Sequence, residues 1–400
     1  MKKRILLAFV TFIILSNTAF AQMWNSKDTL YGNEWINFSQ QYYKISLTED
    51  GIYRIPQATL SKIAAFNAVE GKQLQLFYLG QEIPLYVTNN NKLTNIDYVE
   101  FYGQKNRGLI DKFLYYKADT QQINREYSMF TDTSAYFLTW SSSGGKRYIE
   151  SKTNLTNLPP REPFYIHEQK TVFNGLTIYN EWDKDNQSIG GDRVARSQFD
   201  TAEGFADAYS KDKTYILPAD NIAQNGPDAS CSVRYGTGSG SHKISLNLEG
   251  VTKDEIPTIN FNVKNPTLLL PNAKILTSNK LQIVTKGNNE SKFRVSTISF
   301  NYPRYFNFNN KANFGFNVNV GNAKYLKISN FKTNNKAAIL YDYANGERIE
   351  SALDSGFVKL SLPSSNAARQ CILINPDSVR TVSDLTKVDF IDYKKVMLIF

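Results

Sequence analysis

The sequence predicts a mainly β fold, in which an N-terminal β-rich domain is followed by a β-sandwich. Aromatic residues are abundant, with 24 Tyr, 25 Phe and 4 Trp among 400 residues, and these residue types favour strands. Apolar and polar residues alternate with a period of two in several segments, which is typical of sheets with one buried face. Turn residues separate these segments at short intervals, as they do in β-sandwiches.

The first 21 residues predict an export signal. Residues 2–4 are all basic, and 5–15 are apolar apart from Thr11. Residues 19–21 read Ala-Phe-Ala, a small-x-small site with cleavage expected before Gln22. The alternative is a membrane anchor, but a span needs about 20 apolar residues. We therefore expect residues 1–21 to be a signal peptide and the mature protein to be periplasmic or at the cell surface, an oxidising environment.

Short strands with a single helix are expected next, in an N-terminal β-rich domain over residues 22–210. Two apolar-aromatic runs flank a turn that ends at Gly51, which predicts a hairpin. Pro56 follows and opens a helix near 56–68, because its missing N–H costs little at the first helical position. The strands expected here are Tyr42–Leu47, Ile52–Ile55, Leu74–Leu79, Ile83–Val87, Asp97–Tyr102 and Ala135–Trp140.

The alternation is clearer in the following part of the chain, where we expect a β-sandwich domain over 211–390. Asn345-Gly346 lies between two short apolar runs and marks a tight hairpin. The alternating apolar sets are Ile244, Leu246 and Leu248; Ile259, Phe261 and Val263; Ile298, Phe300 and Tyr302; and Phe314, Phe316, Val318 and Val320.

The last residues differ from this pattern, since 396–400 are five consecutive apolar residues. Such a run fits a strand buried on both faces, as in the parallel sheet of an α/β domain. We therefore expect 391–400 to be the start of a truncated α/β domain. The alternative is a C-terminal strand that completes the sandwich.

Charge and composition exclude several classes of protein. The chain has 46 Lys+Arg against 37 Asp+Glu, a formal charge of +9 that falls to +6 without the three basic residues of 2–4. The remaining basic residues form no cluster, so no nucleic-acid partner is expected. Two Cys cannot build a disulfide-rich scaffold or a four-cysteine zinc site. No P-loop, HExxH motif or nucleophile elbow is present, and we expect no cofactor and no metal.

Two Cys and two His are the remaining candidates for catalysis. Cys231 and Cys371 lie in strand-like contexts, and a buried, inert thiol is the commoner state of such residues. His167 and His242 lie in similar contexts, and a dyad would require spatial contact with a thiol whose pKa is lowered. The two Cys could pair in an oxidising compartment, although the sequence does not bring them together. We assign no catalytic residue.

Two further motifs are expected to be ordinary turns. Asp183 and Asp185 resemble a calcium loop in acidity only, because Gln187 and Ser188 stand where the EF-hand requires Asp or Asn and then Gly. Residues 236–240 are rich in glycine, but no helix pattern follows to bind a phosphate.

Several segments together resemble the N-terminal region of the type IX secretion system sortases, the PorU-type family of gingipain-like cysteine peptidases. Each segment is unspecific alone, but their order and spacing across most of 40–400 carry the resemblance. The segments are Tyr43–Ile45, Asp50–Ile55, Leu79–Pro84, Tyr98–Gly103, Glu126–Asp132, Tyr136–Trp140, Glu203–Phe205 and Ser299–Arg304.

The resemblance implies that this β-rich region precedes a caspase-like α/β domain, which carries the catalytic Cys and His beyond residue 400. It also implies that the whole protein removes C-terminal sorting signals from secreted cargo and attaches the cargo to surface lipopolysaccharide. The implied partners are that cargo and other type IX secretion components at the outer membrane. The implied role of the present chain is to fold, support or shield the catalytic domain.

Two other hypotheses stay open. The chain could be a stand-alone secreted β-sandwich that acts as an adhesion or carbohydrate-binding module, for which exposed Tyr and Trp would be the expected sign. It could also be a complete secreted hydrolase that uses one of the four Cys and His residues. The coding sequence after Phe400 would separate the sortase hypothesis from both.

Overall fold

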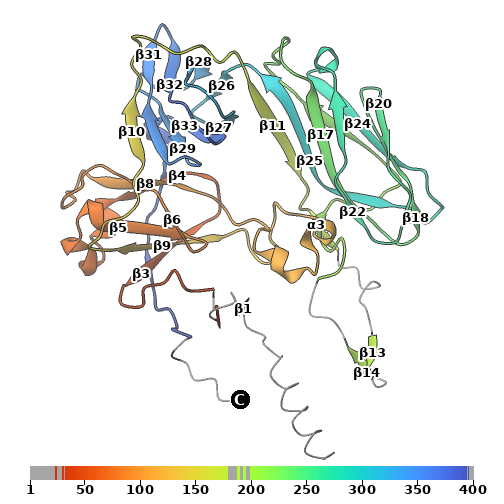
Figure 1. Ribbon diagram of the computed structural model, residues 1–400, viewed down its shortest axis with the longest axis horizontal. Coiled ribbons are helices and arrows are strands. Elements are labelled where there is room, and N and C mark those ends of the chain that lie inside the picture. The colour runs from red at the N-terminus through yellow and green to blue at the C-terminus, as the bar shows by residue number, and fades with distance from the viewer. Residues whose placement is uncertain are drawn as a thin grey trace, which may run out of the picture.

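The computed structural model is mainly β, which confirms the predicted fold class (Figure 1). The larger sheets form three β-sandwiches. No helix in the part of the chain described below is long and apolar enough to span a membrane. The expected signal peptide and the apolar run 396–400 lie outside the described residues. The structure describes residues 23–24, 29–30, 32–178, 187–189, 192–194, 199–393 and 395.

The first sandwich, here called the N-terminal domain, packs a five-stranded sheet in the order β35-β3-β9-β5-β6 on a four-stranded sheet in the order β34-β4-β8-β7. Its core lies between the sheets and includes Ile45, Ile55, Leu76 and Phe101, each at most 2% exposed. The strands are β3 (Tyr42–Leu47), β4 (Gly51–Pro56), β5 (Leu74–Tyr78), β6 (Gln81–Ile83), β7 (Tyr86–Val87), β8 (Tyr98–Gly103), β9 (Ser134–Trp140), β34 (Arg380–Thr381) and β35 (Thr386–Val388).

Two local predictions for this domain are wrong. β3 and β4 are consecutive strands but do not form a hairpin, because β3 pairs with β9 and β35 whereas β4 pairs with β8 and β34. The chain crosses from one sheet to the other at the turn, so the apolar residues of both strands reach the same core. The helix expected near 56–68 is divided into α2 (Gln57–Leu60) and the 3-10 helix η2 (Ala64–Ala68).

The middle sandwich packs the sheet β11-β25-β17-β22, with β23 also paired to β17, on the sheet β16-β24-β19-β20. Its core includes Val233, Leu246, Ile283 and Phe300, all fully buried. The strands are β11 (Tyr165–Val172), β16 (Asp212–Pro218), β17 (Ala229–Thr237), β19 (Ile244–Leu248), β20 (Val251–Asp254), β22 (Val263–Lys264), β23 (Thr267–Leu270), β24 (Ser278–Thr285) and β25 (Phe293–Arg304).

The C-terminal sandwich packs the sheet β10-β30-β29-β33-β27 on the sheet β26-β28-β32-β31. The tight hairpin predicted at Asn345-Gly346 is confirmed: it joins β29 to β30, and Gly346 has a φ of +68°. The strands are β10 (Ile149–Lys152), β26 (Asn307–Lys311), β27 (Asn313–Val318), β28 (Lys324–Phe331), β29 (Ile339–Asp342), β30 (Glu347–Glu350), β31 (Ala352–Asp354), β32 (Phe357–Leu362) and β33 (Arg369–Ile374).

Short elements complete the description. Three two-stranded pairs accompany the sandwiches, together with β18 paired to β21. The elements are β1 (Met23–Trp24), β2 (Thr29–Leu30), η3 (Gly71–Gln73), η4 (Asp111–Leu114), α3 (Ala118–Gln121), β12 (Leu176–Ile178), β13 (Gln187–Ile189), β14 (Asp192–Val194), β15 (Gly204–Ala206), β18 (Ser241–His242), β21 (Thr258–Ile259), η6 (Asn272–Lys274) and η7 (Pro376–Ser378).

Sheet membership differs from the expected division at residue 210. Residues 211–390 contribute strands to all three sandwiches, and β10 and β11, from within 22–210, belong to the C-terminal and middle sandwiches. Alternation with a period of two identifies a strand and its buried face, but it carries no information on which distant strand is the partner. The sequence therefore leaves such long-range pairings open.

The C-terminal sandwich stacks directly on the N-terminal domain, and the middle sandwich lies beside them (Figure 1). Ile52 and Tyr148 belong to a buried cluster with Tyr341 and Ile374, which links the N-terminal domain to the C-terminal sandwich. The rings of Tyr102 and Tyr343 stack across the same boundary with centroids 3.8 Å apart.

Candidate functional site

The four Cys and His residues considered for catalysis lie on four different strands, with His167 on β11 and His242 on β18. Cys231 is on β17 in the core of the middle sandwich, and Cys371 is on β33 in the core of the C-terminal sandwich. Both thiols are free, so the disulfide that the sequence left open is not formed. His242 is buried and its two ring nitrogens lie 2.9 Å from Ser291 Oγ and 2.8 Å from Gly238 O.

The protonation of these groups does not suit nucleophilic catalysis. Burial raises the pKa of Cys231 to about 12, and burial raises the pKa of Cys371 as well. Burial also lowers the pKa of His167 to about 4, with a further contribution from the charge of Arg304. A thiol must be ionised to attack a substrate, so both cysteines are inert near neutral pH.

Metal ligation has no support in the part of the chain that the structure describes, where no three His, Cys, Asp or Glu residues gather. The acidic turn at Asp183 and Asp185 lies outside the described residues. The glycine-rich segment at 236–240 spans the end of β17 and the following turn, where Thr237 Oγ1 donates to Asn260 O at 2.8 Å. This segment is therefore part of a strand and a turn of the middle sandwich.

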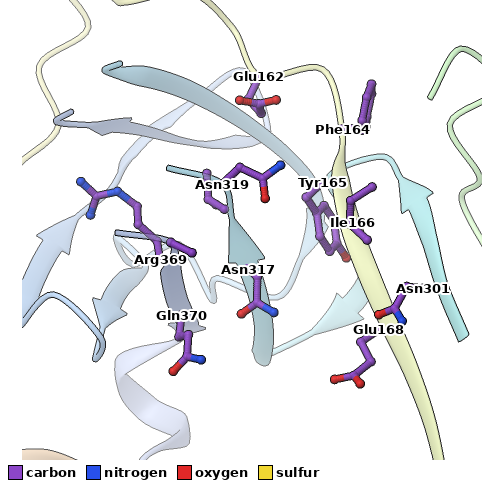
Figure 2. Close-up of a pocket in the computed structure, with 12 residues that line it drawn as sticks. Glu162, Phe164, Tyr165, Ile166, Glu168, Asn301, Asn317, Asn319, Arg369 and Gln370 are labelled. Carbon is purple, nitrogen blue, oxygen red and sulfur yellow. The ribbon is translucent and has the colours of Figure 1, made fainter. Parts of the chain in front are cut away.

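A polar cleft lies where the middle and C-terminal sandwiches meet. Strand β11 is at the edge of one sheet and β27 is at the edge of another, and the cleft opens between β11 and the neighbouring β27 and β33. Figure 2 shows its lining side chains, and its volume is about 350 Å³. The lining residues are Glu162, Phe164, Tyr165, Ile166, Glu168, Asn301, Asn317, Val318, Asn319, Ala368, Arg369 and Gln370.

Side-chain amides dominate the hydrogen-bonding capacity of this cleft. Asn317, Asn319 and Gln370 come from one wall, and Asn301 and Glu168 come from the other (Figure 2). Each amide can donate and accept hydrogen bonds. Asn317 alternates with buried residues on β27, so the period-two pattern of 314–318 predicts that its side-chain amide is exposed. The pattern does not predict that this amide lies opposite β11.

The charged groups around the cleft are already committed to structural contacts. Arg369 is 2% exposed and its Nη1 lies 2.6 Å from both Asp342 Oδ2 and Glu347 Oε2. Lys324 Nζ lies 2.7 Å from Glu162 Oε2. Glu168, the remaining carboxylate of the lining, pairs with Lys170 Nζ at 3.5 Å and accepts a hydrogen bond from Ser299 Oγ. The cleft therefore offers mainly neutral hydrogen-bonding groups, which suits binding more than catalysis.

A second pocket, of about 500 Å³, lies on the other side of β11 and includes His167. Asp220 accepts hydrogen bonds from Arg304 Nε at 2.7 Å and from Arg304 Nη2 at 3.2 Å. Arg304 Nη1 donates to Tyr165 Oη at 2.6 Å. Burial acts to raise the pKa of Asp220, but hydrogen bonds from Arg304, Asn309 and Tyr302, together with the charge of Arg304, outweigh it and lower the pKa to about 2. This network fixes β11 against β25.

Comparison with known proteins identifies a structural relative. No protein-family model matches the chain, and neither does a curated protein sequence. The crystal structure of dimeric latent PorU from Porphyromonas gingivalis matches 87% of this chain with a TM-score of 0.53 and 11% sequence identity. The chain spans 33% of that structure. The fold is therefore PorU-like.

Two carbohydrate-binding modules match smaller parts of the chain. A CBM36 carbohydrate-binding module in complex with calcium and xylotriose covers 23% of this chain and 75% of its own, at 16% identity and a TM-score of 0.18. The CBM36-1 domain of a xylanase from the hindgut metagenome of Trinervitermes trinervoides covers 34% of this chain and 96% of its own, at 10% identity and a TM-score of 0.20. Scores this low carry no functional argument.

Proposed function

We propose that this chain is the N-terminal, non-catalytic region of an exported type IX secretion system sortase. The observation that carries the proposal is the PorU-like fold over 87% of the chain, together with the fact that the chain spans a third of that PorU structure. The resemblance of the ordered segments between Tyr43 and Arg304 supports the same family.

In this proposal the region serves as a rigid support. The N-terminal domain and the C-terminal sandwich share a buried junction in which Glu100 and Tyr341 are at most 2% exposed. Strands β34 and β35 return the chain from the C-terminal sandwich to the N-terminal domain. Such closure would hold the point where a caspase-like domain continues the chain, and that domain would carry the catalytic Cys and His beyond residue 400.

The substrates and partners follow from the same proposal. The whole protein would act at the cell surface or outer membrane, remove C-terminal sorting signals from secreted cargo and attach the cargo to the surface. Other type IX secretion components would be its partners. Buried thiols are consistent with a region that takes no part in the chemistry, because neither is poised for ionisation.

The decisive experiment begins with the coding sequence downstream of Phe400. A continuation with α/β patterning and a new Cys and His is expected, whereas a stop codon there would count against the proposal. In the source bacterium, disruption of the gene should leave secreted cargo with its C-terminal sorting signal, as measured by mass spectrometry of surface and medium proteins. Normal cargo processing in the disrupted strain would contradict the proposal.

A further inference from the structure

An apolar groove lies on the N-terminal domain, on the face of the β3-β9-β5 sheet opposite its core. Its volume is about 820 Å³. Trp35 lies within 5.6 Å of the Phe137 ring and 5.3 Å of the Phe77 ring, centroid to centroid, so aromatic packing fixes one wall. The residues lining the groove include Trp35, Tyr78, Leu79, Leu109, Ile110, Phe113 and Phe137.

Large apolar side chains at the rim of this groove are open to solvent. Leu79 and Leu109 are about half exposed, as is Ile110, and Phe113 is 77% exposed. Phe130, which directly precedes the lining residue Thr131, is 70% exposed. We refer to these five residues as the apolar patch. Contiguous exposed apolar surface of this kind marks an interaction site more often than isolated exposed residues do.

The backbone beneath the apolar patch is held in place. The Asp111 carboxylate, on η4, accepts hydrogen bonds from Ser128 Oγ at 3.0 Å and from Met129 N at 2.7 Å. These bonds join the segment that carries Phe113 to the segment that carries Phe130. The exposure of the patch is therefore a fixed feature of the fold, because a buried carboxylate anchors both segments.

Two cations belong to the segment that carries Phe113: Lys112 lines the groove, and Lys117 follows Phe113 by four residues. Lys112 Nζ lies 4.9 Å from the centroid of the Phe113 ring, and Lys117 Nζ lies 5.6 Å from the centroid of the Tyr116 ring. Among the residues that the structure describes, neither ammonium group has a carboxylate within ion-pair distance. Tyr116 is itself 68% exposed. The surface thus combines apolar side chains, an amphipathic aromatic ring and unneutralised positive charge.

That combination matches a lipid–water interface with negative head groups. Apolar side chains can enter the boundary between head groups and acyl chains, while lysines and tyrosines stay at head-group level. Each lysine near an anionic surface adds to binding. A purely apolar protein partner would leave both ammonium groups without anions. We propose that the apolar patch, with Lys112 and Lys117, docks this domain on a membrane surface that contains anionic lipids.

Vesicle co-sedimentation tests the proposal without reference to sortase activity, so its failure would leave the proposed function standing. The chain from Gln22 to Phe400 keeps every described residue and excludes the apolar run 5–15. It is mixed with vesicles of phosphatidylcholine alone, or of phosphatidylcholine with phosphatidylglycerol. We expect binding to the mixed vesicles, much weaker binding to phosphatidylcholine alone, and a decrease in binding at high salt.

Two double variants separate the contribution of the apolar side chains from that of the lysines. Leu109→Ser with Phe113→Ser, and separately Lys112→Glu with Lys117→Glu, should each weaken partition into the mixed vesicles by about tenfold or more. The matched control is Ile256→Ser with Ile259→Ser, because these residues are 83% and 72% exposed and lie on the middle sandwich. This control should bind as the unsubstituted chain does, and circular dichroism should show the same fold in all variants.

Three results would overturn the proposal. One is the absence of binding to the mixed vesicles. Another is equal weakening by the control pair, which would make the effect one of general hydrophobicity. The third is vesicle binding that is unchanged in the Leu109 and Phe113 variant while self-association without lipid is reduced, which would identify the apolar patch as a protein interface.

Discussion

Tyr341 Oη donates a hydrogen bond to the Glu100 carboxylate across the junction of two sandwiches, although the residues are 241 positions apart in the chain. Both are buried. Arg54 Nε donates to Glu100 Oε1 at 2.8 Å, and Arg348 Nε donates to Tyr341 Oη at 3.0 Å. Burial raises the pKa of Tyr341, and the negative charge of Glu100 raises it further, so the phenol keeps the proton that it donates.

Removal of this hydroxyl should destabilise the junction. Tyr341→Phe keeps the ring packing but leaves Glu100 Oε2 without its buried donor, at a cost of about 1.5–3 kcal/mol. We expect the midpoint of urea unfolding to fall, as measured by tyrosine and tryptophan fluorescence. The control is Tyr116→Phe, because the Tyr116 side chain is exposed and its hydroxyl is free to bond to water. An equal midpoint for Tyr341→Phe and the unsubstituted chain would show that the bond contributes nothing to stability.

His167 should make the stability of the chain sensitive to acid. Its pKa is about 4 in the folded state and near 6.5 in the unfolded state, so protonation favours unfolding. The stability that the neutral His167 ring contributes is fully present above about pH 6.5. It is lost progressively as the pH falls to about 4, which lowers the free energy of unfolding by roughly 1–3 kcal/mol. Arg304 and Lys311 disfavour the protonated ring, whereas Asp220 and Glu168 favour it.

The comparison of His167→Phe with the unsubstituted chain isolates this effect. Phenylalanine retains the ring contacts with Tyr302 and Phe314, whose centroids lie 5.5 and 5.9 Å from the His167 ring. Thermal midpoints measured at several pH values should fall more steeply in the unsubstituted chain between pH 6.5 and 4. The other titrating groups, His242 included, are common to both proteins. If the thermal midpoints of the two proteins fell in parallel with pH, His167 would not be the source of the acid sensitivity.

Neither cysteine should react in the folded chain. The thiols of Cys231 and Cys371 are at most 1% exposed, and their raised pKa values keep them protonated. Iodoacetamide at mildly alkaline pH should label neither residue in native conditions and both in urea, as read by intact-mass spectrometry. Thr252→Cys supplies a positive control on the exposed strand β20. Native labelling of Cys231 or Cys371 at the rate of that control would reopen the hypothesis of a thiol hydrolase.

The strands that return to the N-terminal domain should be needed for its stability. Val382 is 5% exposed, and its carbonyl oxygen accepts a hydrogen bond from Thr59 Oγ1 at 2.9 Å. A chain that ends at Val379 lacks β34, β35 and the buried Val382 side chain. This truncation should lower the free energy of unfolding of the N-terminal domain by about 2 kcal/mol or more. In a trypsin time course, we expect residues 42–103 to be cleaved earlier in this truncated chain than in the full chain.

A chain that ends at Tyr393 is the matched control for this truncation, because it keeps β34 and β35 and every hydrogen bond that they make. It should be cleaved at the same rate as the full chain. If the chain ending at Val379 were equally resistant, the returning strands would be dispensable for the N-terminal domain.

Local signals predicted much of the fold. The turn residues Asn345-Gly346 produce the predicted hairpin, because a glycine at positive φ closes it without strain. The alternation over 314–318 appears as buried Phe314, Phe316 and Val318 on β27. The alternation over 259–263 is less well realised, since Ile259 is 72% exposed and the segment is divided between β21 and β22.

The sequence by itself determined the strand-rich composition and the buried face of most strands, because side chains alternate between the two faces of every strand. Only the tertiary structure decided which strands pair. It separated β3 from β4, brought β35 back to β3, and placed Asn317 opposite Glu168 in the polar cleft. Backbone hydrogen bonds between strands are the same for every side chain, so partner choice emerges only when all three cores are packed together.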